Sequence, residues 1–253
     1  MNVLRIMGAG LAVLALAACS APLEESPAPA SAISAAPTPV VEKSSRGPVN
    51  VVVPEIGYPK RGGGQYEIAA AGGPVIGTAG PLLTYRIAVE RDITGLSAAG
   101  FAEAVEAVYA DPRSWPGTGK WRLRRAGGGE RFDFTIYLAT PATRDKLCAS
   151  SYDQYTSCRN GNSVVINVAR WVHSVPDYGA DLATYRQYVI NHETGHRLFH
   201  GHELCPGPGR PAPVMEQQTL GLHGCVANPW PIVDGKAYSG PSGQYNDPAR
   251  TDP

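Results

Sequence analysis

The stretch NHETGHRLFHGH, residues 191–202, contains four of the six histidines in this chain of 253 residues. It continues a pattern of apolar positions that follows a suitable helix N-cap, Asp181. The spacings within the pattern alternate between three and four residues, as on one face of an α-helix. Its members are Leu182, Tyr185, Val189, His192 and His196. We therefore expect one long helix here, with two histidines on its inward face.

His192, Glu193 and His196 form the pattern His-Glu-x-x-His, which is typical of the active helix of zinc hydrolases. Residues four apart on a helix lie roughly 6 Å apart along its axis, so both imidazoles can reach one metal ion. An unpaired imidazole on an otherwise apolar face would cost free energy, which favours a bound ion. Glu193 would lie beside that ion and could take a proton from metal-bound water. The pattern predicts a Zn²⁺ site with Glu193 as the catalytic base.

The third metal ligand has two candidates, His202 and Glu216. If the helix continued, His200 would lie about 12 Å along the axis from His192, too far for bonds of ~2.1 Å to one ion. If the chain turns after Leu198 instead, His202 can return to the metal. Glu216 would suit the zinc hydrolases in which a glutamate from a later helix completes the site. The proline-rich approach to Glu216 argues against such a helix, so we favour His202.

The spacing of these histidines, with His202 six residues after His196, is similar to that of the metzincin zinc peptidases. The chain more closely resembles a family of secreted actinobacterial proteins of unassigned function, which carry this helix followed by CPGPGRPAPVM and QQTLGL. The resemblance covers roughly residues 62–231 and is most specific over residues 188–225. It therefore extends over most of the chain after the N-terminal segment.

The resemblance implies a set of site residues and a fold. It assigns His192, His196 and His202 as zinc ligands, Glu193 as the base, and Met215 as the methionine turn beneath the metal. The implied fold is α+β, a metzincin-like twisted mixed sheet with two main helices and an irregular C-terminal lobe.

Phe199 departs from the metzincin pattern, which has glycine three residues after the second histidine. The backbone is left-handed at that position, and a residue other than glycine held there costs about 1 to 3 kcal/mol. Zinc binding coupled to folding contributes on the order of 10 kcal/mol, so this strain is tolerable. Either Phe199 adopts the left-handed conformation, or the turn moves to Gly201.

Several other segments show the periodicity of strands or helices. Three alternate apolar and polar residues, as half-buried strands do: 83–89, 132–138 and 163–168. A helix is expected after the first of them, capped by Ser97 and ended by Asp111-Pro112. The third precedes the active helix, and we expect it at the rim of the cleft, where an extended substrate could pair with it.

Four of the five cysteines are predicted to form disulfides that bracket irregular segments of the chain. Cys148 pairs with Cys158 and Cys205 with Cys225 in the connectivity that we prefer among the three possible ones. Each bridge would contribute roughly 3 kcal/mol on the loop-entropy model. The second one brackets a segment rich in proline and glycine, which should be irregular.

The N-terminus predicts export. Residues 1–18 contain a positive charge and then a short apolar run, as secretory signal peptides do. Leu-Ala-Ala-Cys, which ends at Cys19, resembles the bacterial lipobox, whose cysteine is lipidated. We expect an extracytoplasmic protein, lipid-anchored to the bacterial cell membrane at Cys19; the alternative is a secreted protein cleaved near Ala18.

The rest of the chain divides into a tether and a domain. Residues 19–48 are rich in Ala, Pro and Ser without periodicity, as solvated tethers are. Residues 49–253 are expected to form the metzincin-like zinc domain, and a hydrophobic content of 43% suits a globular core. The formal net charge is zero and basic residues do not cluster, which argues against a nucleic-acid partner.

These features together predict a membrane-anchored zinc metallopeptidase that acts as a monomer on a protein or peptide substrate. Zinc-bound water would attack the peptide bond, with Glu193 as its base. The alternative is a non-catalytic, zinc-stabilised binding module of the cell envelope, in which Glu193 would be dispensable. A non-peptide amide such as a cell-wall crosslink would need the same chemistry.

Overall fold

The computed structural model describes residues 55–150, 152–248 and 250–251. The expected signal peptide (1–18), the lipidation site Cys19 and the tether (19–48) lie outside these residues. Among the helices of the described part, none has the length and apolar character that crossing a membrane requires.

Within the described residues the chain forms nine strands, four α-helices and one 3-10 helix. The strands are β1 (Tyr66–Ile68), β2 (Gly72–Ile76), β3 (Leu82–Glu90), β4 (Arg122–Arg125), β5 (Phe134–Ala139), β6 (Cys158–Asn160), β7 (Ser163–Asn167), β8 (Ile232–Val233) and β9 (Lys236–Ala237). The helices are α1 (Ala98–Ala110), η1 (Trp115–Thr118), α2 (Pro141–Cys148), α3 (Val168–His173) and α4 (Leu182–Arg197).

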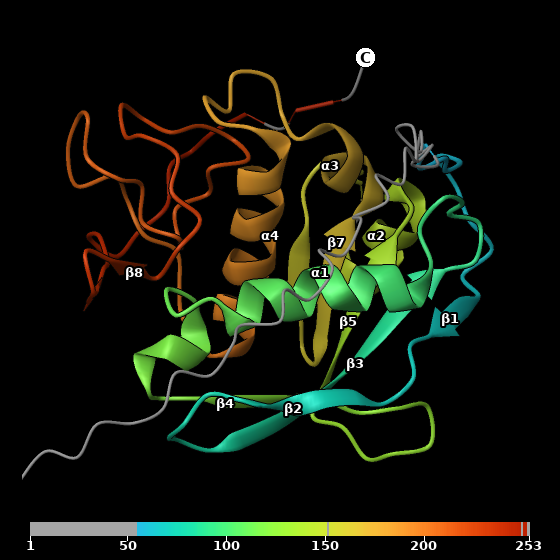
Figure 1. Cartoon of the computed structure of the whole chain (residues 1–253). Helices are drawn as coiled ribbons and strands as arrows, with labels where there is room; N and C mark the ends of the chain where they lie inside the picture. Colours follow the sequence, from blue (N-terminus) through green and yellow to red (C-terminus); the bar gives the residue numbers. More distant parts are fainter. Residues whose placement is uncertain (1–54, 151, 249, 252–253) are drawn as a thin grey trace, which may run out of the picture. The chain divides into compact units, whose positions relative to one another are not determined.

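Seven of the strands form one twisted mixed sheet, as expected from the resemblance. Its order is β2-β4-β3-β5-β7-β6, and β1 pairs with β3 beside this path. The inner strands β4, β3, β5 and β7 are parallel, whereas β1, β2 and β6 are antiparallel to their neighbours. Parallel neighbours need crossover connections, which here include helices (Figure 1). The sheet therefore ends at β2 on one side and at β6 on the other.

The two longest helices pack on this sheet and on each other. α1 contacts β3 and α4, and α4 contacts β7 and β6. In Figure 1, α1 (green) crosses in front of the sheet and α4 (orange) stands beside β7. Both predicted N-caps are present: Ser97 accepts from the N–H of Gly100, and Asp181 from that of Thr184. α1 also ends before Asp111, as predicted.

The three predicted strands are present with ends shifted by one or two residues, and the predicted position of one of them in the sheet is wrong. Phe132 precedes β5, and its ring lies 4.0 Å from the Arg86 guanidinium carbon above it. Val168 begins α3, because Asn167 caps that helix by accepting from the N–H of Ala169. The segment 163–168 is not at the rim. β7 pairs with β5 on one side and β6 on the other, so the outer strand is β6.

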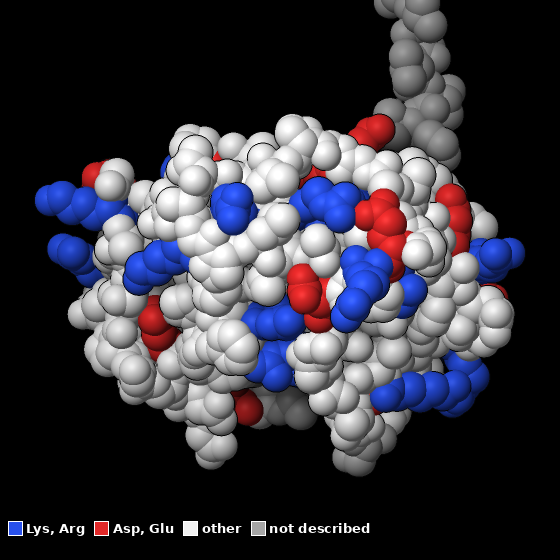
Figure 2. Space-filling model, turned by 90° about the horizontal axis from the view of Figure 1, so that it is seen from below, with Lys and Arg blue, Asp and Glu red and all other residues white. Residues whose placement is uncertain are grey.

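Both predicted disulfides are present. Cys148–Cys158 joins the end of α2 to β6, and Cys205–Cys225 braces the irregular lobe that follows α4. In the described part of this lobe, the regular secondary structure is the β8–β9 hairpin. Figure 2 shows the underside of the molecule, where positive and negative side chains are interspersed.

Candidate metal centre

The helix that carries the histidines ends where a third one can return to the first two. α4 runs to Arg197, Leu198 is its C-cap, and Phe199 has a φ of 70°. The left-handed turn is therefore at Phe199, whereas the φ angle of Gly201 is not positive. The Phe199 ring is 78% exposed, so side-chain packing does not offset the strain of this conformation.

The turn brings His192, His196 and His202 together, as the sequence predicted. The Nε2 atom of His196 lies 3.2 Å from that of His192 and 3.1 Å from that of His202. Ligand nitrogens around one tetrahedral zinc ion stand roughly 3.4 Å apart, since each bond is ~2.1 Å long. The three rings thus converge at nearly the spacing that a zinc ion requires.

Each of the three rings also has its other nitrogen bound to an oxygen. His192 Nδ1 lies 2.8 Å from the Val214 carbonyl, and His196 Nδ1 lies 2.9 Å from the His200 carbonyl. His202 Nδ1 lies 3.0 Å from Gln244 Oε1. Because these oxygens only accept hydrogen bonds, each Nδ1 carries the proton. In the neutral rings all three Nε2 lone pairs therefore point at one another, an arrangement that a cation would stabilise.

The lowered pKa values of His192 and His196 keep these two rings neutral. Burial, together with the charges of the other two rings, lowers the pKa of His192 well below its usual value. Burial lowers the pKa of His196 to about 4. Protons therefore do not occupy the space between the rings at neutral pH, and the donor set fits a divalent metal ion.

Glu193 lies next to this centre and is almost wholly buried. Its Oε2 atom has no hydrogen-bond partner among the described residues. Burial raises the pKa of Glu193 to about 8, and the positive charges of Arg144 and Arg159 act in the opposite direction. A buried carboxyl group with an unused oxygen is thus available to a molecule that enters the site.

Met215 lies directly against α4, the helix that carries His192 and His196. A Cβ atom added at Gly195 would stand 2.4 Å from Met215 Sδ and 2.8 Å from Trp115 Cζ2. The preceding residue, Val214, supplies the carbonyl that holds His192. Met215 therefore packs against the helix that carries His192 and His196.

Glu216, the rival third ligand, is not part of the histidine cluster. Its side chain lies near the disulfide Cys205–Cys225. It is fully buried, and both carboxyl oxygens lack a hydrogen-bond partner among the described residues. Glu216 therefore does not join the three imidazoles.

A cleft of about 300 Å³ opens over the three histidines and Glu193. One part of its wall is the segment from Thr156 to Arg159, which leads into and includes the outer strand β6. Another part is formed by Gln217, Thr219 and Leu220. The histidines thus lie at the bottom of a cleft bordered by a strand edge.

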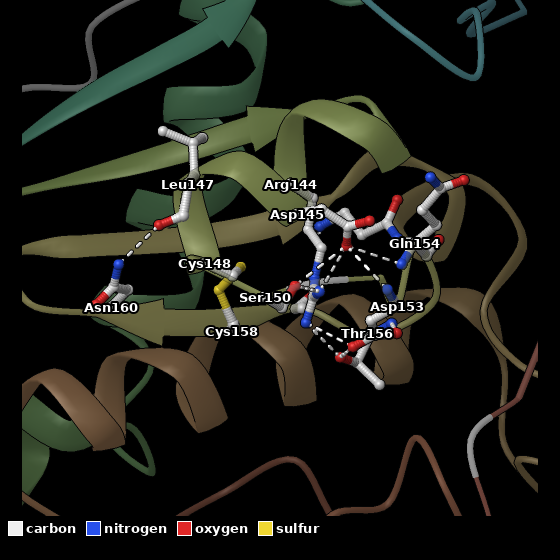
Figure 3. The surroundings of a disulfide bond; sticks show 12 residues. Arg144, Asp145, Leu147, Cys148, Ser150, Asp153, Gln154, Thr156, Cys158 and Asn160 are labelled. Carbon is white, nitrogen blue, oxygen red and sulfur yellow. Dashed lines mark hydrogen bonds and ion pairs between the residues drawn. A yellow bond between two sulfur atoms is a disulfide. The ribbon is translucent and has the colours of Figure 1, made fainter.

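The wall that includes Thr156 is fixed by a buried arginine and a disulfide (Figure 3). The Arg144 guanidinium on α2 donates to the side chains of Asp145, Ser150 and Thr156 at 2.8 to 2.9 Å. It also pairs with Asp153 at 2.6 Å. The guanidinium therefore joins α2 to the segment that lines the cleft.

The opposite wall is fixed by three tyrosines, of which only Tyr185 was predicted from the sequence to lie on the inward face of the helix. Three tyrosine hydroxyls, two of them on α4, bond to the segment after Met215. The pairs are Tyr178 with Gln218 Oε1, Tyr185 with Thr219 Oγ1 and Tyr188 with the Glu216 carbonyl. Tyr185 and Tyr188 belong to α4 and Tyr178 precedes it, but the partners of all three lie in a segment without periodicity.

Two further residues at the site were missed. Arg159 donates from Nε and Nη2 to the His196 carbonyl, at 3.1 and 2.9 Å, and so fixes the last turn of α4. Gln244 accepts from His202 across 42 positions of sequence. No local pattern marks either residue, because each contact depends on how distant segments fold together.

The fold and the site define a mixed α/β domain with a three-histidine centre beside a buried glutamate. The chain belongs to the family described as "Protein of unknown function (DUF3152)", whose family model matches residues 52–232. This agrees with the resemblance to a domain family of unassigned function. No curated protein and no solved structure matches the chain.

Proposed function

We propose that this protein is a zinc-dependent metallopeptidase in which His192, His196 and His202 hold the metal and Glu193 is the base. The observation that carries the proposal is the convergence of three Nε2 atoms whose rings are already fixed through Nδ1. Three neutral imidazoles leave one position of a tetrahedral zinc ion for water, which is the ligand set of catalytic rather than structural zinc sites.

When bound, zinc supplies a Lewis acid and lowers the pKa of a coordinated water. The positive charge of a bound zinc ion would lower the raised pKa of Glu193, and its carboxylate would then accept a proton from the attacking water and return it to the leaving amine. Its burial beside the histidines excludes bulk water, and its unpaired Oε2 leaves an acceptor for this proton. A purely structural zinc site needs no such carboxyl group, so Glu193 favours an enzyme over the alternative of a binding module.

The outer strand β6 suits an extended peptide. It pairs with β7 on one side and ends the sheet on the other. Its residues Cys158 and Arg159 line the cleft. A peptide can add to such an edge through backbone hydrogen bonds, which places a peptide carbonyl near the base of the cleft without demanding a particular side chain.

The proposed site of action is outside the cytoplasm. Two disulfides in the described domain fit an oxidising compartment. Lipidation at Cys19 and the tether of residues 19–48 would then hold the domain near the membrane. We infer a monomer, with the cleft open to protein or peptide substrates.

The test is digestion of a broad peptide library by the purified, zinc-loaded chain, compared with Glu193→Gln. We expect cleavage by the wild type and a loss of about 10²- to 10⁴-fold in the variant, because general base catalysis contributes that much. Glu130→Gln, at an exposed ion pair, is the matched control and should cleave normally. Zinc content is measured for all three proteins.

Equal cleavage by wild type and Glu193→Gln would refute the role of Glu193. Stoichiometric zinc with no cleavage of any peptide would favour the non-catalytic binding module instead. A library of cell-wall crosslinks, digested in parallel, separates peptide from other amide substrates.

A further inference from the structure

The C-terminal segment Gly240–Tyr245 lies against the chain that carries the third histidine. The N–H of Leu204 donates to the Pro241 carbonyl at 2.8 Å, and the N–H of Gly243 donates to the His202 carbonyl at 3.0 Å. Glu203 and Ser242 form an antiparallel bridge between these two bonds. Backbone bonds on both sides of Glu203 thus fix this segment beside His202.

Two more contacts hold the ends of the same segment. At one end the N–H of Gly240 donates to Glu203 Oε2 at 3.0 Å, and a Cβ atom there would stand 2.2 Å from the Leu204 carbonyl oxygen. At the other end the Tyr245 hydroxyl accepts from the N–H of Cys205 at 3.2 Å. The close approach at Gly240 leaves no room for a side chain, so the two backbones lie in direct contact at this position.

The segment continues toward the far wall of the cleft. The Tyr245 ring stacks on His223 with centroids 3.4 Å apart, and Asp247 pairs with His223 Nε2 at 3.1 Å. Arg250 then donates to the carbonyl of Leu220, which lines the cleft, at 2.6 Å. The C-terminal residues therefore connect the third histidine with the opposite side of the cleft.

Gln244 lies in the middle of this segment, and its Oε1 faces His202 Nδ1 at 3.0 Å. The other two histidines are held by backbone carbonyls, of Val214 and His200. His202 alone depends on a side chain for this bond, and it follows the turn rather than lying on α4. Its ring orientation is thus the least constrained by its own element.

We propose that the C-terminal segment Gly240–Tyr245 is part of the metal centre and that Gln244 is the positioning residue for His202. The segment lies beyond the region that the family model matches, which ends at residue 232. The inference rests on the proposed zinc site and adds to it the residue that orients the third ligand. By accepting from Nδ1, Gln244 keeps the Nε2 lone pair of His202 directed at the ion.

The amide oxygen of Gln244 can only accept, so it selects one of the two neutral tautomers of His202. Without it, the ring can rotate or carry its proton on Nε2, and both changes remove a ligand from the metal. Partners of this kind change metal affinity by about 10- to 100-fold. Gln244 is exposed, so water competes for the bond and we expect the lower end of this range.

The test measures the zinc dissociation constant of the full chain by competition with a chelator. Gln244→Leu removes the acceptor while keeping the bulk of the side chain, and should weaken zinc binding about 10-fold. Gln244→Glu keeps an acceptor and should stay within about three-fold of the wild type. Asp247→Ala breaks a contact with His223, two residues beyond this segment, without touching His202, and should also bind zinc normally.

A second measurement needs no metal. ¹⁵N chemical shifts of the His202 ring in the zinc-free chain report its tautomer, and we expect protonated Nδ1 in the wild type and loss of that preference in Gln244→Leu. Wild-type zinc affinity and an unchanged tautomer in Gln244→Leu would overturn the inference. So would equal weakening in Gln244→Leu and Asp247→Ala, since the whole segment rather than Gln244 would then act. A wild type that binds no zinc at all would instead refute the proposed function.

Discussion

Gly195 and Met215 are in contact across the base of the centre, where a Cβ atom at Gly195 would stand 2.4 Å from Met215 Sδ. The glycine lies between the two helical histidines, directly before His196. Met215 follows Val214, whose carbonyl fixes His192. This close contact therefore joins α4 to the segment that orients one of its histidines.

Gly195→Ala should disturb both stability and metal binding. The added methyl overlaps Met215 and Trp115, and overpacking of this kind costs about 1 to 3 kcal/mol. Gly201→Ala is the matched control, because nothing lies within 4 Å of its Cβ position. Urea unfolding of the zinc-free proteins measures the difference. A Gly195→Ala protein as stable as Gly201→Ala would show that the contact relaxes without cost.

Phe199→Gly should stabilise the domain. Phe199 has a φ of 70° and an exposed ring, so glycine removes backbone strain at little loss of packing. We expect a gain of about 1 kcal/mol, which corresponds to a rise in Tm of about 2 to 4 °C for a domain of this size. Phe199→Ala keeps the strained backbone and should show no such rise. Equal Tm values for the two variants would contradict this explanation.

Glu216 should make the stability of the domain depend on pH. Burial raises the pKa of Glu216 to about 8 in the folded chain, against an ordinary value of 4.5. The folded state then binds a proton that the unfolded state releases, so stability is complete below pH 4.5 and is lost as the pH rises toward 8. Glu216→Gln keeps the shape without the charge.

We therefore expect Glu216→Gln to be more stable than the wild type at pH 8, by on the order of 1 to 3 kcal/mol, and to match it near pH 4.5. The control is Glu130→Gln, at an exposed carboxylate, which should change the pH profile little. Chemical denaturation of the two variants and the wild type across this pH range measures the effect. A constant difference between wild type and Glu216→Gln at every pH would argue against a shifted carboxyl group.

Arg144→Leu should be strongly destabilising. The buried guanidinium pairs with Asp145 and Asp153, and its removal leaves two carboxylates without a cation at the cleft wall. Breaking a buried pair in this way costs about 3 to 5 kcal/mol. Arg124→Leu removes an arginine from the exposed pair with Glu130 and should cost less than about 1 kcal/mol. Similar losses in the two variants, measured by thermal unfolding, would show that the network around Arg144 contributes little.

The sequence predicted the parts of the fold that depend on local interactions. The caps Ser97 and Asp181, the ends of α1 and both disulfides are confirmed, because each is set by neighbours along the chain. Helix geometry allowed His202 to reach His192 and His196 if the chain turned after Leu198, with Glu216 as the alternative, and the three imidazoles converge in the structure. That turn occurs at Phe199, which is one of the two positions considered.

The sequence could not predict relationships that depend on distant segments. β6 has three residues, two of them Arg159 and Asn160, and so shows no strand pattern, yet it is the outer strand of the sheet. The hydrogen bond from His202 to Gln244 could not be predicted either, because it joins two irregular segments. Apolar periodicity indicates only which face of an element is buried. Predicting these contacts also requires the order of the strands and the path of the loops.

Crystals of the chain grown with zinc, with diffraction data collected on both sides of the zinc absorption edge, test the central claim most directly. We predict one strong anomalous peak within bonding distance, about 2.1 Å, of the Nε2 atoms of His192, His196 and His202. A peak bound by Glu216 in place of His202, or no peak among the three imidazoles, would contradict it.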